Sequence, residues 1–377
     1  MTTTPHIVVL GAGYTGLTAA KLLAKRTGAT VTLINNRDRF VERMRNHQLA
    51  AGQQLRDMPL HDLLKSTGIR LIIDHVTRID PAQRQVELAR GAEPVGYDLL
   101  VYALGSHADL DTVPGAAEHA NAVATLEQAT RLRDRMRTAD TVAVVGAGPT
   151  GIEAVTELAE TYPDRTVRLA TSGALGAALS DHGREYLHQA FDRLGIQVWE
   201  HAKVAKVAAD GLLLEDGTRV DADTVAWTTG FEVSGLAREA GLAVDDRGRT
   251  LVDATLRSES HPEIYAIGDA AAAHTQDGQE LRMGCGPGGL ATACAFHAIT
   301  DRMAGRTPEP LRVKSDALCF SLGQRDGLLQ PTDLDGSPRG KVRTGRQVSI
   351  MKKAVLRATG WYNLRYPALV VAGARHA

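Results

Sequence analysis

Residues 142–153 read VAVVGAGPTGIE, and residues 7–16 read IVVLGAGYTG. In both segments an apolar run leads directly into glycines with the spacing G-x-G-x-x-G. One copy of this motif is a weak signal, because short glycine-rich turns also occur for packing reasons alone. Two copies in one chain are better explained by two dinucleotide-binding loops.

The sequence around each motif predicts a strand, a helix and a second strand. The apolar runs are continuous, as in strands that are buried on both faces of a parallel sheet. The first unit is expected to have a strand at 7–10, a helix at 17–24 and a strand at 30–34, and the second a strand at 141–145, a helix at 151–160 and a strand at 166–169. Such a βαβ unit is the setting in which this glycine motif binds a dinucleotide.

The three glycines of each loop have different physical roles. The first allows a tight turn out of the strand, the second lets a pyrophosphate approach the backbone, and the third lets the helix pack closely on the strand. The helix N-terminus then presents free N–H groups to the phosphates. In this order the positions are Gly11, Gly13 and Gly16 in the first loop and Gly146, Gly148 and Gly151 in the second.

The end of the second strand usually carries an acid that binds the adenosine ribose. Here that position is Asn35 in the first unit and Thr171 in the second. Asn35 can still hydrogen-bond a ribose hydroxyl. Thr171 does not repel a 2′-phosphate, and Ser172 with Arg165 or Arg168 is expected near one. NADH and NADPH therefore both stay open as the nucleotide.

The 377 residues exceed one usual domain of about 100 to 200 residues. Each unit is followed by further strand patterns, and each half closes on a strand that ends in glycine, at Gly105 and at Gly230. The further strands are expected at 71–73, 86–88 and 99–103 and, in the second half, at 198–207, 212–214 and 224–227. We expect residues 1–113 and 255–313 to form one nucleotide-binding domain, residues 114–254 the other, and residues 314–377 a separate C-terminal region.

The composition fits a globular protein, with 44% hydrophobic and 4% aromatic residues. We expect an intracellular protein, because we find neither a leader pattern nor a run of about 18 apolar residues. Cys285, Cys294 and Cys319 are too few and too irregularly spaced for a disulfide framework, a zinc site or a CxxC pair, so no metal is expected.

The near-neutral net charge of −1 conceals a basic tail. Asp335 is the last acidic residue, and nine basic residues follow Ser337. They are Arg339, Lys341, Arg343, Arg346, Lys352, Lys353, Arg357, Arg365 and Arg375. Apolar residues such as Ile350 and Val355 lie between them. Two interpretations stay open: contact with an anionic membrane, or packing of the tail against the acidic remainder of the chain.

The two glycine loops, the strands that end at Gly105 and Gly230, and the segment HPEIYAIGD at 261–269 together resemble the pyridine nucleotide-disulfide oxidoreductase superfamily of flavoproteins. Within it, the absence of a redox cysteine pair makes the chain similar to type II NADH dehydrogenases and AIF-like flavoproteins. The resemblance covers about residues 5–310. It implies an α/β fold with two Rossmann-like domains, one for FAD and one for NAD(P)H, and a small C-terminal region.

The resemblance also implies roles for single residues. The first loop would hold non-covalent FAD, with Val76 contacting adenine through its backbone, and Gly268 and Asp269 next to the ribityl chain and pyrophosphate. The second loop would hold the nicotinamide nucleotide, with Glu153 as the acidic residue just after it. Gly105 and Gly230 would lie beside the cofactors.

Two further segments are expected near the flavin. Helix-starting N–H groups at Gly288 and Gly289 can face the negative charge of the reduced ring; the alternative is an ordinary helix start with loose loop glycines. Arg43 and His47 follow the first unit, and His47 is a candidate proton donor if it titrates near neutrality. The alternative for this segment is a solvated helix face.

The electron acceptor is left open by the sequence. In type II dehydrogenases an AQxxxQ-like element receives the quinone, whereas the corresponding stretch here reads GGLATACA. The first hypothesis is an NAD(P)H:quinone oxidoreductase at the cytoplasmic face of the membrane. The second is a soluble flavoprotein reductase with a protein or small-molecule acceptor, for example in a biosynthetic pathway. The third is a flavin-bearing binding protein; no nucleic acid is expected as a partner, and the oligomeric state stays open.

Overall fold

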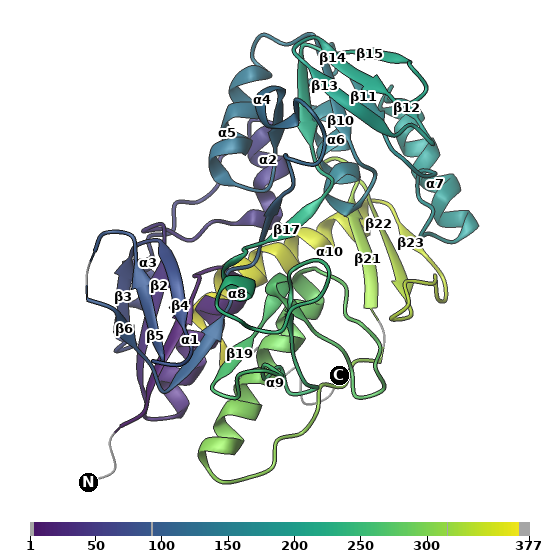
Figure 1. The fold of residues 1–377 in the computed structure, drawn as a ribbon. Helices are drawn as coiled ribbons and strands as arrows, with labels where there is room; N and C mark the ends of the chain where they lie inside the picture. The colour runs from purple at the N-terminus through teal and green to yellow at the C-terminus, as the bar shows by residue number, and fades with distance from the viewer. Residues whose placement is uncertain (1–3, 92, 315, 369–377) are drawn as a thin grey trace.

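Two five-stranded parallel sheets of the same plan form the centre of the molecule (Figure 1). The computed structural model describes residues 4–91, 93–314 and 316–368. The first sheet has the order β19-β7-β1-β2-β3 and the second the order β12-β11-β10-β16-β9. Their strands are β1 (His6–Leu10), β2 (Thr30–Asn35), β3 (Arg70–Ile73), β7 (Leu99–Tyr102) and β19 (Ile264–Ala266), and β9 (Ala120–Ala122), β10 (Thr141–Val145), β11 (Thr166–Ala170), β12 (Gln197–Trp199) and β16 (Thr224–Trp227). The α/β fold with two Rossmann-like domains is confirmed.

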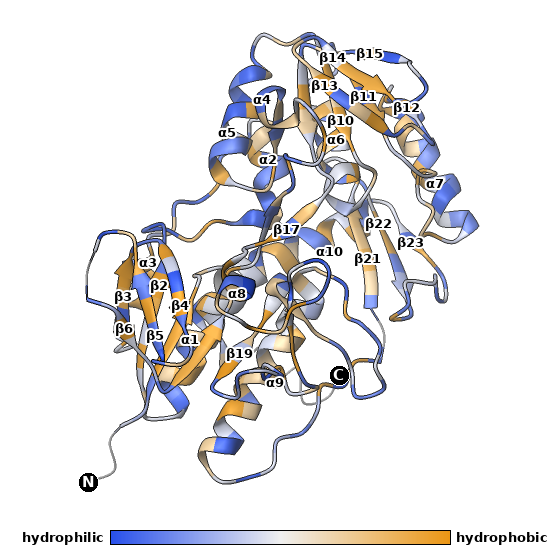
Figure 2. Cartoon of the chain, viewed as in Figure 1, coloured by the Kyte–Doolittle hydropathy of each residue, from blue (hydrophilic) through white to orange (hydrophobic). Residues whose placement is uncertain are grey.

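The central strands are apolar throughout because helices and loops cover both faces of each sheet. Figure 2 shows the hydrophobic colour concentrated on strands, whereas the peripheral helices α5 and α7 mix hydrophobic and hydrophilic residues. Before the C-terminal region, the longer helices are α1 (Tyr14–Arg26), α5 (Leu126–Arg135), α6 (Pro149–Thr161), α7 (Asp181–Arg193) and α9 (Cys285–Met303). The shorter ones are η1 (Arg43–Arg45), α2 (Asn46–Ala50), α3 (Leu60–Leu64), α4 (Ala116–His119), α8 (Leu236–Glu239) and η2 (Gly268–Ala270).

Each domain carries an additional three-stranded antiparallel sheet. These are β4 (Val76–Asp80), β5 (Gln85–Leu88) and β6 (Val95–Gly96), and β13 (Val204–Ala208), β14 (Gly211–Leu214) and β15 (Arg219–Asp221). The single strand expected at 198–207 is wrong. β12 ends at Trp199, His201 adopts a φ of 51°, and β13 starts at Val204 in a different sheet.

A two-stranded antiparallel ribbon joins the two domains. It consists of β8 (Ser106–Ala108) and β17 (Phe231–Val233), which directly follow Gly105 and Gly230. Both glycines have a positive φ, 69° and 68°, which lets the chain turn sharply out of each closing strand. After β17, Ala237 already packs in the core of the first domain, and the short strands β18 (Thr250–Leu251) and β20 (Ala271–Ala272) follow. The domain limits at 113, 254 and 313 stay predictions.

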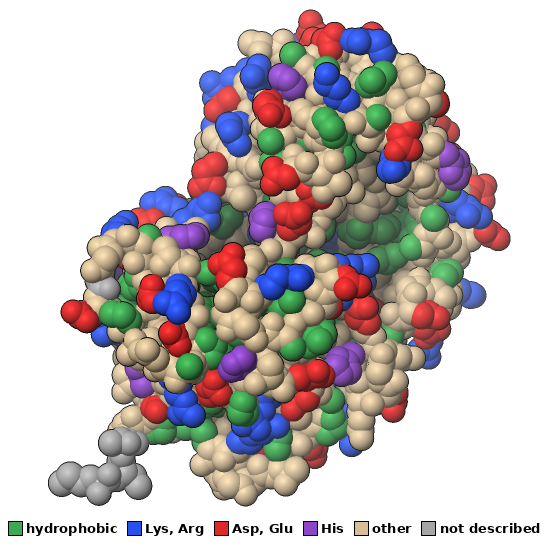
Figure 3. Space-filling view, in the orientation of Figure 1, with side chains coloured by type: hydrophobic (Ala, Val, Ile, Leu, Met, Phe, Trp, Pro, Cys, Tyr) green, Lys and Arg blue, Asp and Glu red, His purple; other side chains and the backbone are tan. Residues whose placement is uncertain are grey.

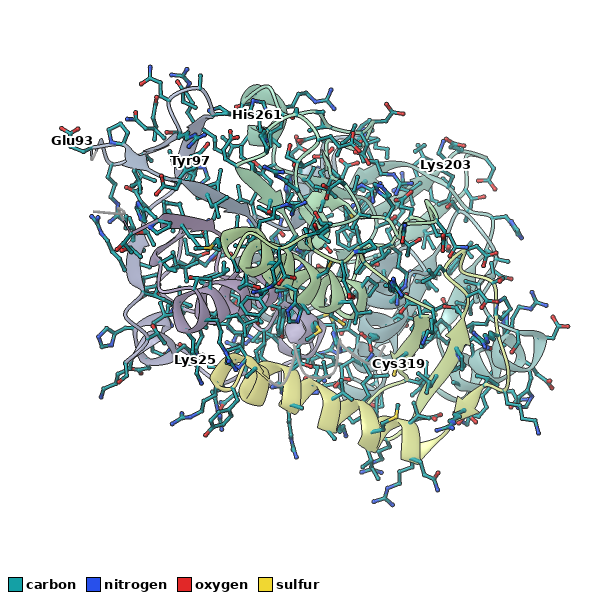
Figure 4. All side chains as sticks on the ribbon, turned by 90° about the horizontal axis from the view of Figure 1, so that it is seen from below. Lys25, Glu93, Tyr97, Lys203, His261 and Cys319 are labelled. Atoms are coloured by element: carbon teal, nitrogen blue, oxygen red, sulfur yellow. The ribbon has the colours of Figure 1, made fainter. Side chains whose placement is uncertain are left out.

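The C-terminal region adds a small antiparallel sheet and a helix. The sheet contains β21 (Asp316–Ser321), β22 (Gly327–Thr332) and β23 (Arg343–Thr344), and α10 (Arg346–Arg357) with the π-helical turn η3 (Ala358–Asn363) follows. β21 packs on α6, and α10 packs on β22 and β21. Figure 4 shows α10 along one edge of the molecule, with Cys319 on the strand beside it. Within the described ranges, we find no helix with the length and apolarity needed to cross a bilayer.

Candidate dinucleotide and electron-transfer site

The first glycine loop is held together by backbone contacts that exclude a side chain. Gly11 has a φ of 95°, and a Cβ atom there would overlap the carbonyl oxygen of Ala103. A Cβ atom on Gly16 would in turn overlap the carbonyl oxygen of Gly11. These two glycines therefore allow β1, α1 and β7 to approach one another, as the spacing predicts.

The second glycine loop repeats this geometry against different neighbours. Gly146 has a φ of 103°, and a Cβ atom there would lie 2.9 Å from Cβ of Thr229. A Cβ atom on Gly151 would overlap the Gly146 carbonyl oxygen and lie 2.7 Å from Oγ1 of Thr228. The Thr228 hydroxyl donates to the Val145 carbonyl oxygen at 2.7 Å, which ties the end of β16 to the loop.

The middle glycines, Gly13 and Gly148, have no such internal reason to be glycine. A Cβ atom at either position would meet no protein atom within 4 Å. Each caps the N-terminus of its helix with extended backbone (φ −72° and −71°) and without a side-chain cap. Exposed, uncapped N–H groups facing open space are what a pyrophosphate requires, so both loops fit a dinucleotide.

The two predicted ribose positions differ in their surroundings. Asn35 Oδ1 accepts from the backbone N–H of Ala12 at 2.8 Å, and its Nδ2 donates to the Arg37 carbonyl oxygen at 2.8 Å. The Asn35 amide thus braces the first loop. Thr171 is 8% exposed at the end of β11.

The arginines expected near Thr171 bind elsewhere. Arg165 pairs with Asp140, the residue before β10, and Arg168 Nε donates to Gln197 Oε1 at 3.1 Å, at the start of β12. Both contacts lie toward the amino ends of parallel strands, away from Thr171. The supporting cation for a 2′-phosphate that the sequence suggested is therefore not provided by these two side chains.

The N-termini of α1 and α9 meet at the segment that carries Asp269. A Cβ atom on Gly268 would lie 2.9 Å from Thr15 Oγ1, and one on Gly288 would lie 3.4 Å from Thr15 Cγ2. The next residue, Gly289, faces open space. Two helix N-termini with their positive dipole ends therefore converge on one crevice, which suits the pyrophosphate and the reduced ring of a flavin.

Asp269 lies in a polar network with the interdomain ribbon. Its Oδ2 accepts from Ser106 Oγ at 2.7 Å and lies 4.0 Å from Arg43 Nη1. Arg43 also donates to the Ser106 carbonyl oxygen, and its guanidinium lies 5.5 Å from the ring centroid of Phe231. Arg43 and Asp269, each expected beside the flavin, thus lie close together, whereas Val76 lies apart from this network, with its side chain in the core at the start of β4.

His47 is not on a solvated helix face. It is 3% exposed on α2, which packs on α5 and α6 of the second domain. Burial holds the pKa of His47 below its ordinary value, so the ring is neutral at pH 7. Its Nε2 atom finds no hydrogen-bond partner among the described residues. The polar composition of 43–53 did not indicate this burial, because docking on a distant domain causes it.

Glu153 forms a buried ion pair with Lys352, a residue that the sequence did not single out for the site. Their side chains are 10% and 12% exposed, respectively. Glu153 Oε1 also accepts from the Ser321 N–H at 2.8 Å, and Lys352 Nζ donates to the Cys319 carbonyl oxygen at 2.7 Å. Burial opposes ionisation of Glu153, but the Lys352 charge keeps its pKa below the usual value. One sequence signal points to Lys352: its four-residue spacing from the buried Val348 and Leu356.

A hollow separates the part of the molecule that carries β10–β16 from the part that carries α9, and hydrophobic side chains line one of its walls (Figure 3). The two glycine loops belong to these two parts. Ligands bound at the two loops would therefore approach each other across this hollow.

The family model described as Pyridine nucleotide-disulphide oxidoreductase matches residues 5–297. An NADH dehydrogenase-like protein of Mycobacterium tuberculosis is 32% identical over 307 residues, which cover 74% of this chain and 76% of that protein. A demethylphylloquinone reductase of Synechocystis is 28% identical over 73% of this chain and 74% of its own. A type II NADH:quinone oxidoreductase of Staphylococcus haemolyticus is 26% identical over 93% of both chains.

Solved structures agree in fold. The sulfide:quinone oxidoreductase of Aquifex aeolicus superposes with a TM-score of 0.82 at 20% identity, over 96% of this chain and 92% of the other. NDH2 of Plasmodium falciparum, solved with NADH, gives 0.78 at 15% identity over 99% of both chains. At these identities the likeness speaks for the fold alone.

The open space at the two middle glycines gives a paired prediction. Gly13→Leu is expected to yield a folded protein without bound flavin, because the side chain fills the space that the pyrophosphate needs. Gly148→Leu is expected to keep the flavin and to raise KM for NAD(P)H by roughly tenfold or more, which corresponds to about 1.4 kcal/mol of lost binding. Absorption at the flavin bands and steady-state kinetics measure the two effects. Loss of flavin in Gly148→Leu, with retention in Gly13→Leu, would show that the assignment of the loops is reversed.

The buried ion pair predicts a non-additive pair of variants. Lys352→Met leaves a buried unpaired carboxylate and is expected to lower the free energy of unfolding by about 3–5 kcal/mol at pH 7. In the wild type Lys352 lowers the folded-state pKa of Glu153, so the stability that the pair provides is lost only as pH falls from the ordinary value of about 4 through that lower folded-state pKa, and the deficit of the variant should shrink over this range. Urea titrations measure both effects.

The double variant Glu153→Gln with Lys352→Met is the matched control. It removes both charges and should recover most of the stability that Lys352→Met loses. Additive losses in the double variant would contradict a buried pair.

Proposed function

The chain belongs to the pyridine nucleotide-disulphide oxidoreductase family and is an FAD-dependent NAD(P)H oxidoreductase, and on this premise we propose that its electron acceptor is a quinone. Two relatives that align over about three quarters or more of the chain are named for quinone reduction. Bound FAD would supply the redox chemistry, taking a hydride from NAD(P)H and passing the electrons to the acceptor.

The chain's own residues supply binding and alignment. The N–H groups at Gly13 and Gly148 would hold the two pyrophosphates, and the N-terminus of α9 would face the ring that gains negative charge. Asp269, whose carboxylate accepts a hydrogen bond from Ser106, would orient the ribityl chain that joins the pyrophosphate of FAD to its ring. Alignment of the nicotinamide ring with the flavin ring then accounts for most of the protein's contribution to hydride transfer.

The buried Glu153–Lys352 pair is the observation that carries the quinone proposal. Reducing a quinone to a quinol requires protons at its oxygens, and this pair places protonatable groups in a water-poor position after the second loop. Burial raises the pKa of Cys285, the first residue of α9, and the Lys352 charge opposes that rise. Lys352 of the pair is therefore close enough to the N-terminus of α9 to act on it electrostatically. Because this N-terminus would face the flavin, an electron acceptor must bind near it.

The outer face of α10 supports a membrane as the source of the quinone. The apolar side chains Ile350, Met351 and Val355 of this helix are 58%, 37% and 54% exposed, whereas Val348 and Leu356 are buried. Lys353 and Arg357 are exposed on the same helix. Apolar anchors beside positive charge suit an anionic lipid surface, at about 1 kcal/mol for each nearby basic residue. These exposed residues support our proposal of a peripheral protein at the cytoplasmic membrane face.

Quinone reduction is tested by an anaerobic titration of the flavoprotein. NADH, and in a second run NADPH, should bleach the flavin absorption, and one equivalent of a water-soluble quinone such as menadione should restore it. The rate of bleaching with each nucleotide shows which one is preferred. Bleaching that no quinone reverses would reject the proposed acceptor.

Membrane contact is tested by sedimentation with liposomes that contain anionic lipid. The double variant Ile350→Glu with Val355→Glu should lose retention on the liposomes, because it removes two apolar anchors and adds negative charge. Its turnover with menadione in solution should be unchanged. Met303→Glu, on α9 and 37% exposed in the wild type, is the matched control and should bind like the wild type. Equal binding of all three proteins would contradict the role of α10.

A further inference from the structure

Helix α6 carries three glutamates toward the C-terminal region. Glu153, Glu157 and Glu160 follow one another at spacings of four and three residues, which places them on one face of the helix. Glu153 contacts the Ser321 N–H of β21, and Glu160 accepts from the backbone N–H of Gln324 just after that strand. The row thus runs from the buried ion pair to the protein surface.

Glu157 occupies the middle of this row and is 1% exposed. Its Oε1 accepts from the side-chain amide of Gln53, and the Gln324 side chain also hydrogen-bonds to its carboxyl group. We find no cation paired with Glu157 among the described residues. Burial, followed by the repulsion of Glu160 and Glu153, outweighs these hydrogen bonds and raises the pKa of Glu157 to about 7. The carboxyl group therefore exchanges its proton near physiological pH.

The outer end of the row reaches solvent. Gln324 is exposed, Gln53 and Glu160 are partly exposed, and the absence of a side chain at Gly323 lets the Glu160 carboxylate approach the backbone. Lys353 Nζ donates to the Gln324 carbonyl oxygen at this surface. At the inner end, His47 on α2 and Lys352 on α10 are the titratable groups that act on Glu153.

The reaction requires a route of this kind. NAD(P)H, one proton and a quinone give NAD(P)⁺ and a quinol, so the hydride accounts for both electrons and one proton, and the second proton must come from water. Glu153 and His47 are 8% and 3% exposed and cannot collect it directly. A carrier between Glu153 and solvent would supply this proton.

We propose that Glu157 is this carrier, relaying a proton from the surface at Gln53, Gln324 and Glu160 to Glu153. The inference rests on the proposed quinone reduction. In the step, the O–H bond of Glu157 breaks as an O–H bond forms on Glu153, and Glu157 regains a proton from water by way of Glu160. Because Lys352 keeps Glu153 ionised, Glu153 holds this proton only transiently and passes it to the acceptor oxygen, while bound FAD would deliver the electrons of NAD(P)H. Glu157 acts through Glu153 and touches neither substrate nor cofactor.

Glu157→Gln, in the flavin-loaded full-length protein, tests the relay. The variant keeps a polar side chain of the same size but cannot pass the proton. Turnover with menadione should fall by roughly 10²-fold, whereas turnover with ferricyanide, which takes up electrons without protons, should not change. In the wild type, menadione turnover should decline as pH rises through about 7, because Glu157 loses its proton, and the variant should lack this limb.

Three results separate the possible failures. Unchanged menadione turnover and pH profile in Glu157→Gln would overturn the relay, and so would an equal loss with ferricyanide, which indicates a structural role. Wild-type protein that reduces ferricyanide but no quinone would instead reject the proposed function, and the relay with it. Glu157→Ala provides a second measurement: formate should restore its menadione turnover, and absence of any rescue in a folded, flavin-loaded protein counts against the relay.

Discussion

The fold depends on backbone-to-backbone approaches that tolerate no side chain. In each domain the third glycine of the loop lies against the carbonyl oxygen of the first, and the first lies against the end of the neighbouring strand. This closeness brings the helix start up to the sheet edge and directs its free N–H groups outward. The middle glycine has only empty space before it, so the same six-residue spacing both closes the fold and leaves room for a ligand.

Features governed by contacts near in sequence could be predicted. The βαβ units, the glycine roles and the segment before Asp269 are local patterns, and the sheets formed where the apolar runs lie. Features governed by distant contacts could not. Residues 198–207 look like one strand because both parts are apolar, yet the two parts join different sheets. His47 looks solvated by composition, yet α2 crosses to the other domain and is buried there. Lys352 looks like one of many tail cations until β21 brings Glu153 to it.

Helix α6 connects the parts of the molecule that these contacts join. Its N-terminus belongs to the second loop, its acidic face meets β21, and its other neighbours include α2 from the first domain. A carboxylate one turn beyond a phosphate-binding loop is electrostatically unfavourable unless a cation balances it. Lys352 provides that cation from a segment nearly 200 residues away, which explains why the basic tail cannot be treated as a detached appendage.

Helix α10 carries a buried lysine and exposed apolar side chains on the same twelve residues. Positions 348, 352 and 356 face inward, where two are apolar and the third is the lysine that balances Glu153. Ile350, on the side of the helix away from Lys352, and Val355, seven residues after Val348, are apolar although water surrounds them, which costs free energy unless another surface covers them. The lysine that balances Glu153 and the apolar side chains that a surface would cover therefore belong to one helix.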